Sequence, residues 1–171
     1  MSEAIDVLRV LWTQAPANYA GKYYSLRNAY CEPRPRIVPK IMIGGDGGRY
    51  VLPLVAEKAD IWFSYQRPVN VLAEKVNELR AHCERHHRSW DSIRKATPLT
   101  VFLDKRGAMA KRRALGTIER DQPYFAGDPV ELREHLSQLI ELGFYTVILT
   151  FADFPRLADM HLFLEDVRPF L

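Results

Sequence analysis

The sequence has few of the residues that mark specialised classes of protein. Only two of its 171 residues are cysteines, Cys31 and Cys83, which excludes a disulfide scaffold, and they do not have the spacing of a metal site. No apolar run approaches the roughly 20 residues of a membrane-spanning helix. The first residues also lack the basic region and apolar stretch of a signal peptide. We therefore expect a cytoplasmic protein that does not contact a membrane.

The sequence also lacks a strong excess of charge of either sign. Its 24 basic and 21 acidic residues give a net charge of +3, which is too small to indicate binding to nucleic acid. Hydrophobic residues make up 47% of the chain, enough to bury a core, which excludes a disordered tail. We expect residues 1–171 to form one domain.

Beyond residue 39, short apolar runs alternate with amphipathic segments. The apolar runs predict strands at 40–44, 60–65, 97–103 and 144–151. The amphipathic segments predict a first helix that ends near Lys58 and further helices at about 68–86, 105–120, 128–143 and 155–166. Continuous apolar strands are typical of a parallel sheet covered by helices. A doubly wound sheet and part of a (β/α)8 barrel both fit this pattern. A complete barrel needs about 200 residues or more, so the length allows only half of one.

The first 39 residues have a different character. Residues 3–12 place apolar side chains on one face and predict a helix. Residues 19–39 are aromatic and then proline-rich, which prevents a helix there. We interpret 19–39 as a long irregular surface excursion in which Tyr23, Tyr24 and Leu26 form a short extended piece.

Five segments resemble, in order, the luciferase-like monooxygenase family of flavin- and deazaflavin-dependent oxidoreductases. IGGDGGRYVLPLVAEKADIWF (43–63) is similar to the family's strand ending in Ile-Gly-Gly, its helix and its Ala-Asp pair. The other four are EAIDVLRVLWT (3–13), YAGKYYSLRNAYCEPRP (19–35), LRAHCERHHRSWDSI (79–93) and FAGDPVELREHLSQLIELGFYTVILTF (125–151). The family fold is a complete (β/α)8 TIM barrel, and the resemblance covers only its last four β/α units. It therefore implies an α/β partial barrel, the C-terminal half, without the family's early acidic, His and aromatic positions around the cofactor ring.

A glycine-rich loop lies between a predicted strand and a predicted helix. Its residues are Gly44, Gly45, Asp46, Gly47 and Gly48. Glycines let backbone N–H groups approach a phosphate closely, and a helix N-terminus favours negative charge. The resemblance implies that this loop, with Arg49 nearby, holds the phosphate-bearing tail of FMN or of the F420 deazaflavin. The alternative interpretation is a tight turn that needs positive φ.

Two features of this loop depart from the family pattern. Asp46 stands where the family usually has Ser or Gly, and its carboxylate would repel a phosphate unless it is turned away or compensated by Arg49. Pro53 would disrupt a helix that began at Gly48, so we expect the helix to begin nearer Tyr50 or Val51.

Other polar and aromatic residues have structural interpretations beside functional ones. Trp62 could line a ring pocket or pack in the barrel, and Asp60 is expected to fix the turn before its strand. His82 and His86 share a helix face and could chelate a metal, but histidines near a helix end are usually solvated, and we predict no metal site. The basic cluster, consisting of Lys105, Arg106 and residues 111–113, is interpreted as a solvated helix face.

The sequence therefore predicts the C-terminal portion of a luciferase-like oxidoreductase that contributes the cofactor phosphate loop. The alternative is a non-catalytic half-barrel that acts as an interaction subunit or has no activity of its own. No catalytic residue or substrate can be assigned. Half a barrel has open sheet edges, here at about 40–44 and 144–150, and open apolar edges recruit other strands. We expect a homodimer with a mainly apolar interface, or a chain that supplies the missing half.

Overall fold

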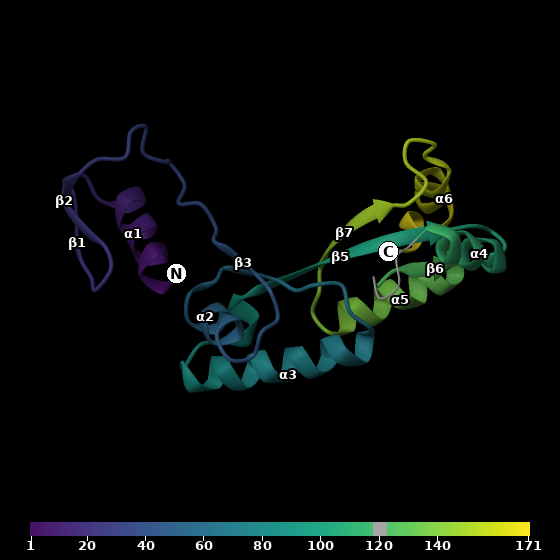
Figure 1. Cartoon of the computed structure of the whole chain (residues 1–171), viewed down its shortest axis with the longest axis horizontal. Helices are drawn as coiled ribbons and strands as arrows, with labels where there is room; N and C mark the ends of the chain where they lie inside the picture. Colours follow the sequence, from purple (N-terminus) through teal and green to yellow (C-terminus); the bar gives the residue numbers. More distant parts are fainter. Residues whose placement is uncertain (118–122) are drawn as a thin grey trace.

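The main sheet is parallel, and its four principal strands pair in chain order. Figure 1 shows the sheet with helices along one side of it. The computed structural model describes residues 1–117 and 123–171. The strands are β3 (Met42–Gly44), β4 (Ile61–Phe63), β5 (Arg94–Leu103) and β7 (Thr146–Phe151). A doubly wound sheet reverses its strand order at a switch point, whereas a barrel adds each strand beside the previous one. The observed order confirms the predicted α/β partial barrel.

Helices follow each of these strands, as the alternating pattern predicted. They are α2 (Val51–Lys58), α3 (Val69–Arg85), α4 (Gly107–Thr117), α5 (Pro129–Glu141) and α6 (Ala158–Asp166), with short 3-10 turns η1 (Trp90–Ser92) and η2 (Arg168–Phe170). The start of α5 was predicted correctly because its capping hydrogen bonds join residues that are neighbours in the sequence. Asp128 accepts hydrogen bonds from the N–H groups of Val130 and Glu131 at 2.8 and 2.9 Å, and the Glu131 carboxylate accepts one from the Asp128 N–H. The last three residues of the helix predicted at 105–120 lie outside the described residues.

One short strand of the main sheet was not predicted from the sequence. The strand β6 (Phe125–Gly127) pairs in parallel with Val101–Leu103, the carboxyl end of β5. Three residues carry too little periodicity to distinguish a strand from a loop, and β6 exists because the long strand β5 extends far enough to pair with it.

The irregular excursion predicted at 19–39 is partly wrong, because it contains most of a β-hairpin. The strands β1 (Ala17–Ala20) and β2 (Ser25–Ala29) pair antiparallel, after the helix α1 (Ser2–Thr13). Leu26 lies in β2, but Tyr23 and Tyr24 lie in the connecting turn. The Glu3 carboxylate accepts hydrogen bonds from the N–H groups of residues 22–24, so a distant side chain fixes the turn.

The helix α1 and the hairpin form an arm that contacts the end of the sheet through apolar and polar side chains. Ile5 is buried in the main core, and Lys58 pairs with Asp6 at 2.5 Å. Arg9 lies 3.7 Å from Asp60, whose Oδ2 accepts a hydrogen bond from the Ile41 N–H at 2.8 Å. Asp60 therefore fixes the turn before β4, as expected. Figure 1 shows this arm at the opposite end of the molecule from β7 and α6.

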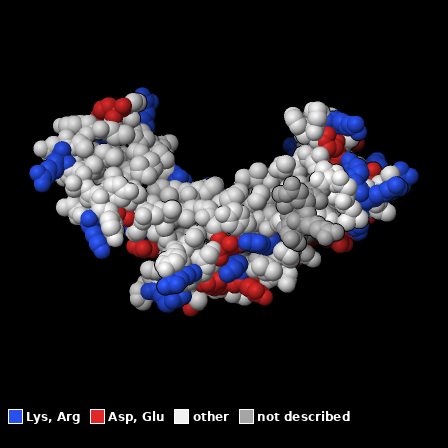
Figure 2. Space-filling model, in the orientation of Figure 1, with Lys and Arg blue, Asp and Glu red and all other residues white. Residues whose placement is uncertain are grey.

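The two faces of the main sheet are covered differently. Side chains of paired residues in register lie on the same face, so Ile43, Trp62, Leu99 and Leu149 face the helices. The other face, which we call the inner face, consists of their neighbours along each strand: Met42, Gly44, Ile61, Phe63, Ala96, Pro98, Thr100, Thr146, Ile148 and Thr150. Figure 2 shows a hollow between the two ends of the molecule, lined mostly by uncharged side chains.

The sheet is open at both ends. Among the described residues, β3 pairs only with β4, and β7 pairs only with β5. These are the two open edges that the sequence predicted. No helix in the described ranges is long and apolar enough to cross a membrane.

Candidate functional site

The glycine-rich loop joins β3 to α2 at the carboxyl end of the sheet. Gly45 has a φ of +116°, a conformation that only glycine adopts readily. Its N–H donates to the Phe63 carbonyl at 2.9 Å, and its carbonyl accepts a hydrogen bond from the Trp62 indole at 2.7 Å. The positive φ at Gly45 bears out the interpretation as a tight turn, and phosphate binding by the loop stays a prediction. Trp62 is fully buried and packs against Phe144, so it is a core residue and not part of a ring pocket.

The backbone N–H groups of this loop form a set of donors at the start of α2. The helix begins at Val51, as Pro53 indicated, and the N–H groups of Val51 and Leu52 donate to the Gly47 carbonyl at 3.0 and 3.1 Å. The five N–H groups of residues 46–50 donate to no other group in the described part of the chain. Free N–H groups beside a helix N-terminus are the donors that a phosphate uses.

The charge of Asp46 is compensated by a residue that the sequence analysis missed. Arg67 Nε donates to Asp46 Oδ2 at 2.9 Å, and only 13% of the Asp46 side chain is exposed. Arg49, which was expected to compensate Asp46, instead lies over the Tyr50 ring at 4.9 Å from its centroid. Arg67 follows β4, and residues at the carboxyl ends of barrel strands are the ones that line the site. The position of Arg67 just after a predicted strand is therefore the feature of the sequence that could have identified it.

The helix α3 supports the other side of the loop. A Cβ at Gly48 would collide with the Glu78 carboxylate, so the helix and the loop approach closely. The His82 side chain is 8% exposed, and its Nδ1 lies 3.0 Å from the Arg85 guanidinium. Burial, and then the positive charge of Arg85, lower the pKa of His82. His82 is therefore a buried residue of α3, and the described residues contain no group of three or more side chains that could hold a metal.

A cleft of about 480 Å³ lies on the inner face beside the loop. It is lined by Tyr65, Gln66, Arg67, Pro98, Thr100 and Pro123. Gln66 Oε1 accepts a hydrogen bond from the Thr100 N–H at 2.9 Å, which ties the end of β4 to β5. Because Arg67 lines this cleft and also binds Asp46, it connects the glycine-rich loop to the inner face of the sheet.

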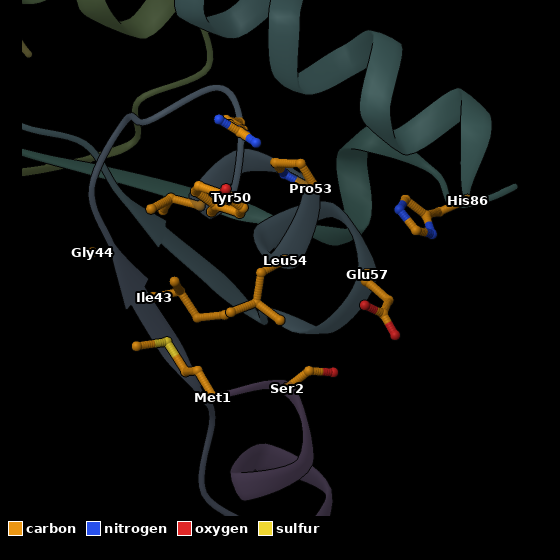
Figure 3. A pocket seen from close by; sticks show the side chains of 11 residues that line it. Met1, Ser2, Ile43, Gly44, Tyr50, Pro53, Leu54, Glu57 and His86 are labelled. Carbon is orange, nitrogen blue, oxygen red and sulfur yellow. The ribbon is translucent and has the colours of Figure 1, made fainter. Parts of the chain in front are cut away.

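A second cavity, of about 470 Å³, lies on the outer side of α2 (Figure 3). Met1 and Ser2 at the start of α1 form one side of it. The rest of its wall is mainly apolar and includes Ile43, Tyr50, Val51, Pro53 and Leu54. Arg49, Glu57 and His86 are polar side chains in its lining. Such a lining suits apolar packing better than it suits a polar ligand.

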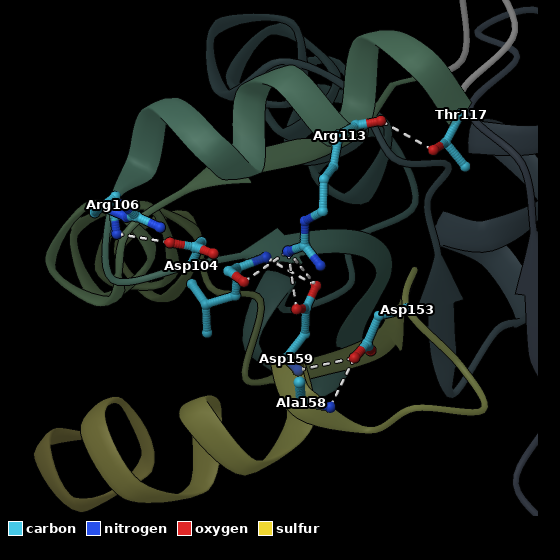
Figure 4. Close-up of polar contacts among 8 residues, drawn as sticks. Asp104, Arg106, Arg113, Thr117, Asp153, Ala158 and Asp159 are labelled. Atoms are coloured by element: carbon cyan, nitrogen blue, oxygen red, sulfur yellow. Dashed lines mark hydrogen bonds and ion pairs between the residues drawn. The ribbon is translucent and has the colours of Figure 1, made fainter.

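The basic cluster is a solvated helix face, as interpreted, except at Arg113, which pairs with a buried carboxylate. Asp159 is 2% exposed and accepts hydrogen bonds from Arg113 Nη2 at 2.9 Å and from the Leu103 N–H at 3.0 Å (Figure 4). Arg113 also donates to the Leu103 carbonyl at 2.7 Å. These contacts hold α4 and α6 to the end of β5, so Arg113 has a structural role. Lys105 and Lys111 do lie in exposed pairs, with Asp166 and Glu131.

Several solved structures share this arrangement. The chain superposes on an F420-dependent secondary alcohol dehydrogenase in complex with an F420-acetone adduct with a TM-score of 0.79 at 15% identity, covering 98% of this chain and 60% of that one. It superposes on the F420-dependent tetrahydromethanopterin reductase of Methanopyrus kandleri with a TM-score of 0.76 at 17% identity, covering 98% and 61%. DmoA of Hyphomicrobium sulfonivorans gives a TM-score of 0.71 at 19% identity, covering 93% and 47%. These similarities show the fold.

Sequence comparison gives the family. An FMNH2-dependent dimethylsulfone monooxygenase of Pseudomonas fluorescens (strain Pf0-1) is 29% identical over 87 residues, which are 51% of this chain and 24% of that protein. The chain thus corresponds to about a quarter of this relative's length and to about 60% of the first two solved structures. The family model for the luciferase-like monooxygenases matches residues 1–151. The chain therefore belongs to the luciferase-like monooxygenase family.

Proposed function

We propose that this chain forms part of a flavin- or F420-dependent oxidoreductase and that residues 44–49 bind the phosphate of the cofactor. The observation that carries the proposal is the row of five N–H groups at residues 46–50, which donate to no other described group and lie at the start of α2. The similarity to an F420-dependent dehydrogenase and to an FMNH2-dependent monooxygenase supports this class of cofactor.

The loop has the chemistry that a phosphate requires. Hydrogen bonds from backbone N–H groups to an anion are charge-assisted, and the dipole of α2 adds to them. Neither Gly47 nor Gly48 has a side chain to block the approach of a ligand. The pair with Arg67 keeps the Asp46 carboxylate neutralised and turned toward Arg67. Fixing Asp46 therefore removes the repulsion that this residue would otherwise cause.

The cofactor ring would extend from the loop toward the inner-face cleft. Arg67 and Tyr65 lie between the two, with the guanidinium 5.8 Å from the centroid of the Tyr65 ring. The bound cofactor would supply hydride transfer or oxygen activation, and these residues would bind and orient it. We assign no catalytic acid or base to this chain.

A cycle of variants at Asp46 and Arg67 tests the proposal. Arg67→Met leaves the Asp46 carboxylate uncompensated beside the phosphate, so we expect it to weaken FMN or F420 binding by about tenfold, which corresponds to roughly 1.4 kcal/mol. Asp46→Asn in the same chain should restore binding. Fluorescence titration of the chain with each cofactor gives the affinities. Lys111→Met, which breaks an exposed ion pair elsewhere, is the matched control and should leave binding unchanged.

Two results would contradict the proposal. Equal affinities for the parent chain and Arg67→Met would place the phosphate away from this loop. Failure of both cofactors to bind the parent chain at millimolar concentration would favour the alternative, a non-catalytic half-barrel. One observation favours that alternative: the chain covers only 60% of the F420-dependent dehydrogenase that it resembles.

A further inference from the structure

The buried side chain of Trp62 is bonded to the backbone of the glycine-rich loop. Its indole N–H donates to the Gly45 carbonyl at 2.7 Å, although the two residues are 17 positions apart in the chain. Trp62 has no exposed surface, and its ring packs against Phe144 with 5.5 Å between the ring centroids. A buried donor that loses its acceptor is costly, so the indole holds the Gly45 carbonyl toward the core.

The direction of the Gly45 carbonyl sets the direction of the next N–H group. A trans peptide unit is planar, and its C=O and N–H bonds point in opposite directions. The peptide between Gly45 and Asp46 is trans. Because its carbonyl points at the buried indole, the Asp46 N–H on the same peptide points away from the core. Trp62 therefore turns the first free donor of the loop outward.

Two other peptide units of the loop are fixed by hydrogen bonds of the backbone. The Gly45 N–H donates to the Phe63 carbonyl at 2.9 Å, which ties the start of the loop to β4. The Gly47 carbonyl accepts hydrogen bonds from the first two N–H groups of α2, at 3.0 and 3.1 Å. By the same planarity, the Gly48 N–H points away from α2. The N–H groups of Asp46 and Gly48 therefore both lie on the open side of the loop.

Tryptophan supplies something at this position that core packing alone does not need. Phenylalanine would also fill a buried place on β4, but only tryptophan brings an N–H donor to it. Trp62 pairs in register with Ile43, two residues before Gly45, so its indole lies under the loop. Its hydrogen bond therefore joins the middle of β4 to the turn that follows β3.

Both constraints on Asp46 come from the same part of the chain. Trp62, in β4, directs the Asp46 N–H outward through the Gly45 carbonyl. Arg67, which follows β4, holds the Asp46 carboxylate at 2.9 Å. The residue therefore presents its backbone donor to the open side of the loop while its negative charge is bound elsewhere.

We propose that Trp62 is a positioning residue of the phosphate loop, whose indole N–H presents the Asp46 N–H to the phosphate of the cofactor. The Gly48 N–H, directed by the bonds to the Gly47 carbonyl, is the second donor. Trp62 does not touch the cofactor in this role, because its ring is fully buried. This inference rests on the proposed function, and it adds which donors the phosphate uses and which residue directs the first of them.

Nuclear magnetic resonance of the 15N-labelled chain tests the donors without any substitution. Inorganic phosphate, and then FMN, is titrated into the parent chain while the backbone N–H signals are followed. The signals of Asp46 and Gly48 should shift the most, because a hydrogen bond to an anion acts directly on the donor. Phosphate that shifts other signals of residues 44–50 and leaves Asp46 unmoved would overturn the inference.

The variant Trp62→Phe then removes the indole donor and keeps an aromatic ring in the core. We expect it to weaken FMN binding by about tenfold, as for the loss of one hydrogen bond to a charged group, and to reduce the phosphate-induced shift at Asp46 more than at Gly48. Phe144→Leu is the matched control, because it disturbs packing against the same indole ring but leaves its N–H in place. It should bind FMN within about twofold of the parent chain. Circular dichroism and urea denaturation give the folded fraction of each variant.

The outcomes separate this role from the proposed function. Equal FMN affinity of Trp62→Phe and the parent chain would overturn the positioning role and leave a phosphate site at residues 44–49. Equal weakening by Phe144→Leu would also overturn it, since the effect would then belong to core packing. No shift at residues 44–50 in the parent chain with either FMN or phosphate would contradict the proposed function itself, and the positioning role with it.

Discussion

Two adjacent positions on β7 show how differently the two faces of one sheet are treated. Leu149 faces α5 and α6 and packs against the main core, whereas Ile148, one residue earlier, is 48% exposed on the inner face. The same contrast holds on β3, where Ile43 is 6% exposed and Met42 is 49% exposed. Both faces are apolar, but helices of this chain cover the whole of one face and only the carboxyl end of the other, where α4 packs over Phe102. Apolar side chains on both faces are typical of a parallel sheet that is buried on both sides.

The largest expected effect comes from comparing one residue on each face. Leu99 of β5 is 2% exposed on the helix face, and Leu99→Ala should lower the free energy of unfolding by about 3 kcal/mol, because it removes buried methyl groups and leaves a cavity. Ile148→Ala should cost under about 1 kcal/mol, because its side chain is half exposed. Urea denaturation of both variants measures the difference, and equal losses would show that the inner face at Ile148 is covered in solution.

The next effect concerns the ion pair that holds the helix layer to the sheet. Asp159→Asn removes the charge opposite Arg113 and should destabilise the chain by about 2–3 kcal/mol, since breaking a buried pair leaves the remaining partner uncompensated. Asp166→Asn breaks the exposed pair with Lys105 and should cost at most about 1 kcal/mol. Thermal unfolding distinguishes them, and a similar small loss in both would mean that Asp159 is hydrated in solution.

The helix-covered face was the part that sequence predicted best. Four continuous apolar runs gave the four principal strands, and the Asp128 and Glu131 pattern gave the start of α5, because both signals are local. The stripe of α3 that includes Leu72, Val76 and Cys83 is buried for the same reason. Periodicity reports which positions are buried, and the sheet's helix face obeys it.

The contacts that sequence missed join residues far apart in the chain. Arg67 and Asp46 are 21 positions apart, and Arg113 and Asp159 are 46 apart. No spacing rule relates such pairs, so the basic cluster was interpreted by composition alone. The hairpin turn likewise depends on Glu3, about 20 residues before it. The candidate loop itself was found from its glycines, but the compensating residue near it depends on where the end of β4 lies.

A smaller effect links the stability of the chain to pH. Burial lowers the pKa of His82 below its usual value of 6.5, so the unfolded chain binds a proton more readily than the folded one. Stability is therefore full above pH 6.5 and falls as the pH drops below it, until the folded pKa is passed. Burial also lowers the pKa of His135, which adds to the same trend.

Two histidine variants distinguish the contribution of His82 to this pH dependence from that of other groups. His82→Gln should reduce the fall in melting temperature between pH 7 and pH 5. His161→Gln, at an exposed histidine on α6, should leave that fall unchanged. A pH dependence that is unchanged in His82→Gln would assign the whole effect to other groups.

The smallest expected effect is a local loss of protection in the arm, where the Glu3 carboxylate holds the hairpin turn. Hydrogen bonds from the N–H groups of Tyr23, Lys22 and Tyr24 lower the pKa of Glu3, against some opposition from burial, so its carboxylate favours the folded turn at any pH above its usual value of 4.5. This contribution is lost as the pH falls through the lowered pKa. Glu3→Gln should therefore speed hydrogen exchange at residues 22–24 while the amides of β5 keep their protection. Equal loss of protection in β5 would show that the arm and the main sheet unfold as one unit, because the Ile5 and Lys58 contacts would then be strong enough to couple them.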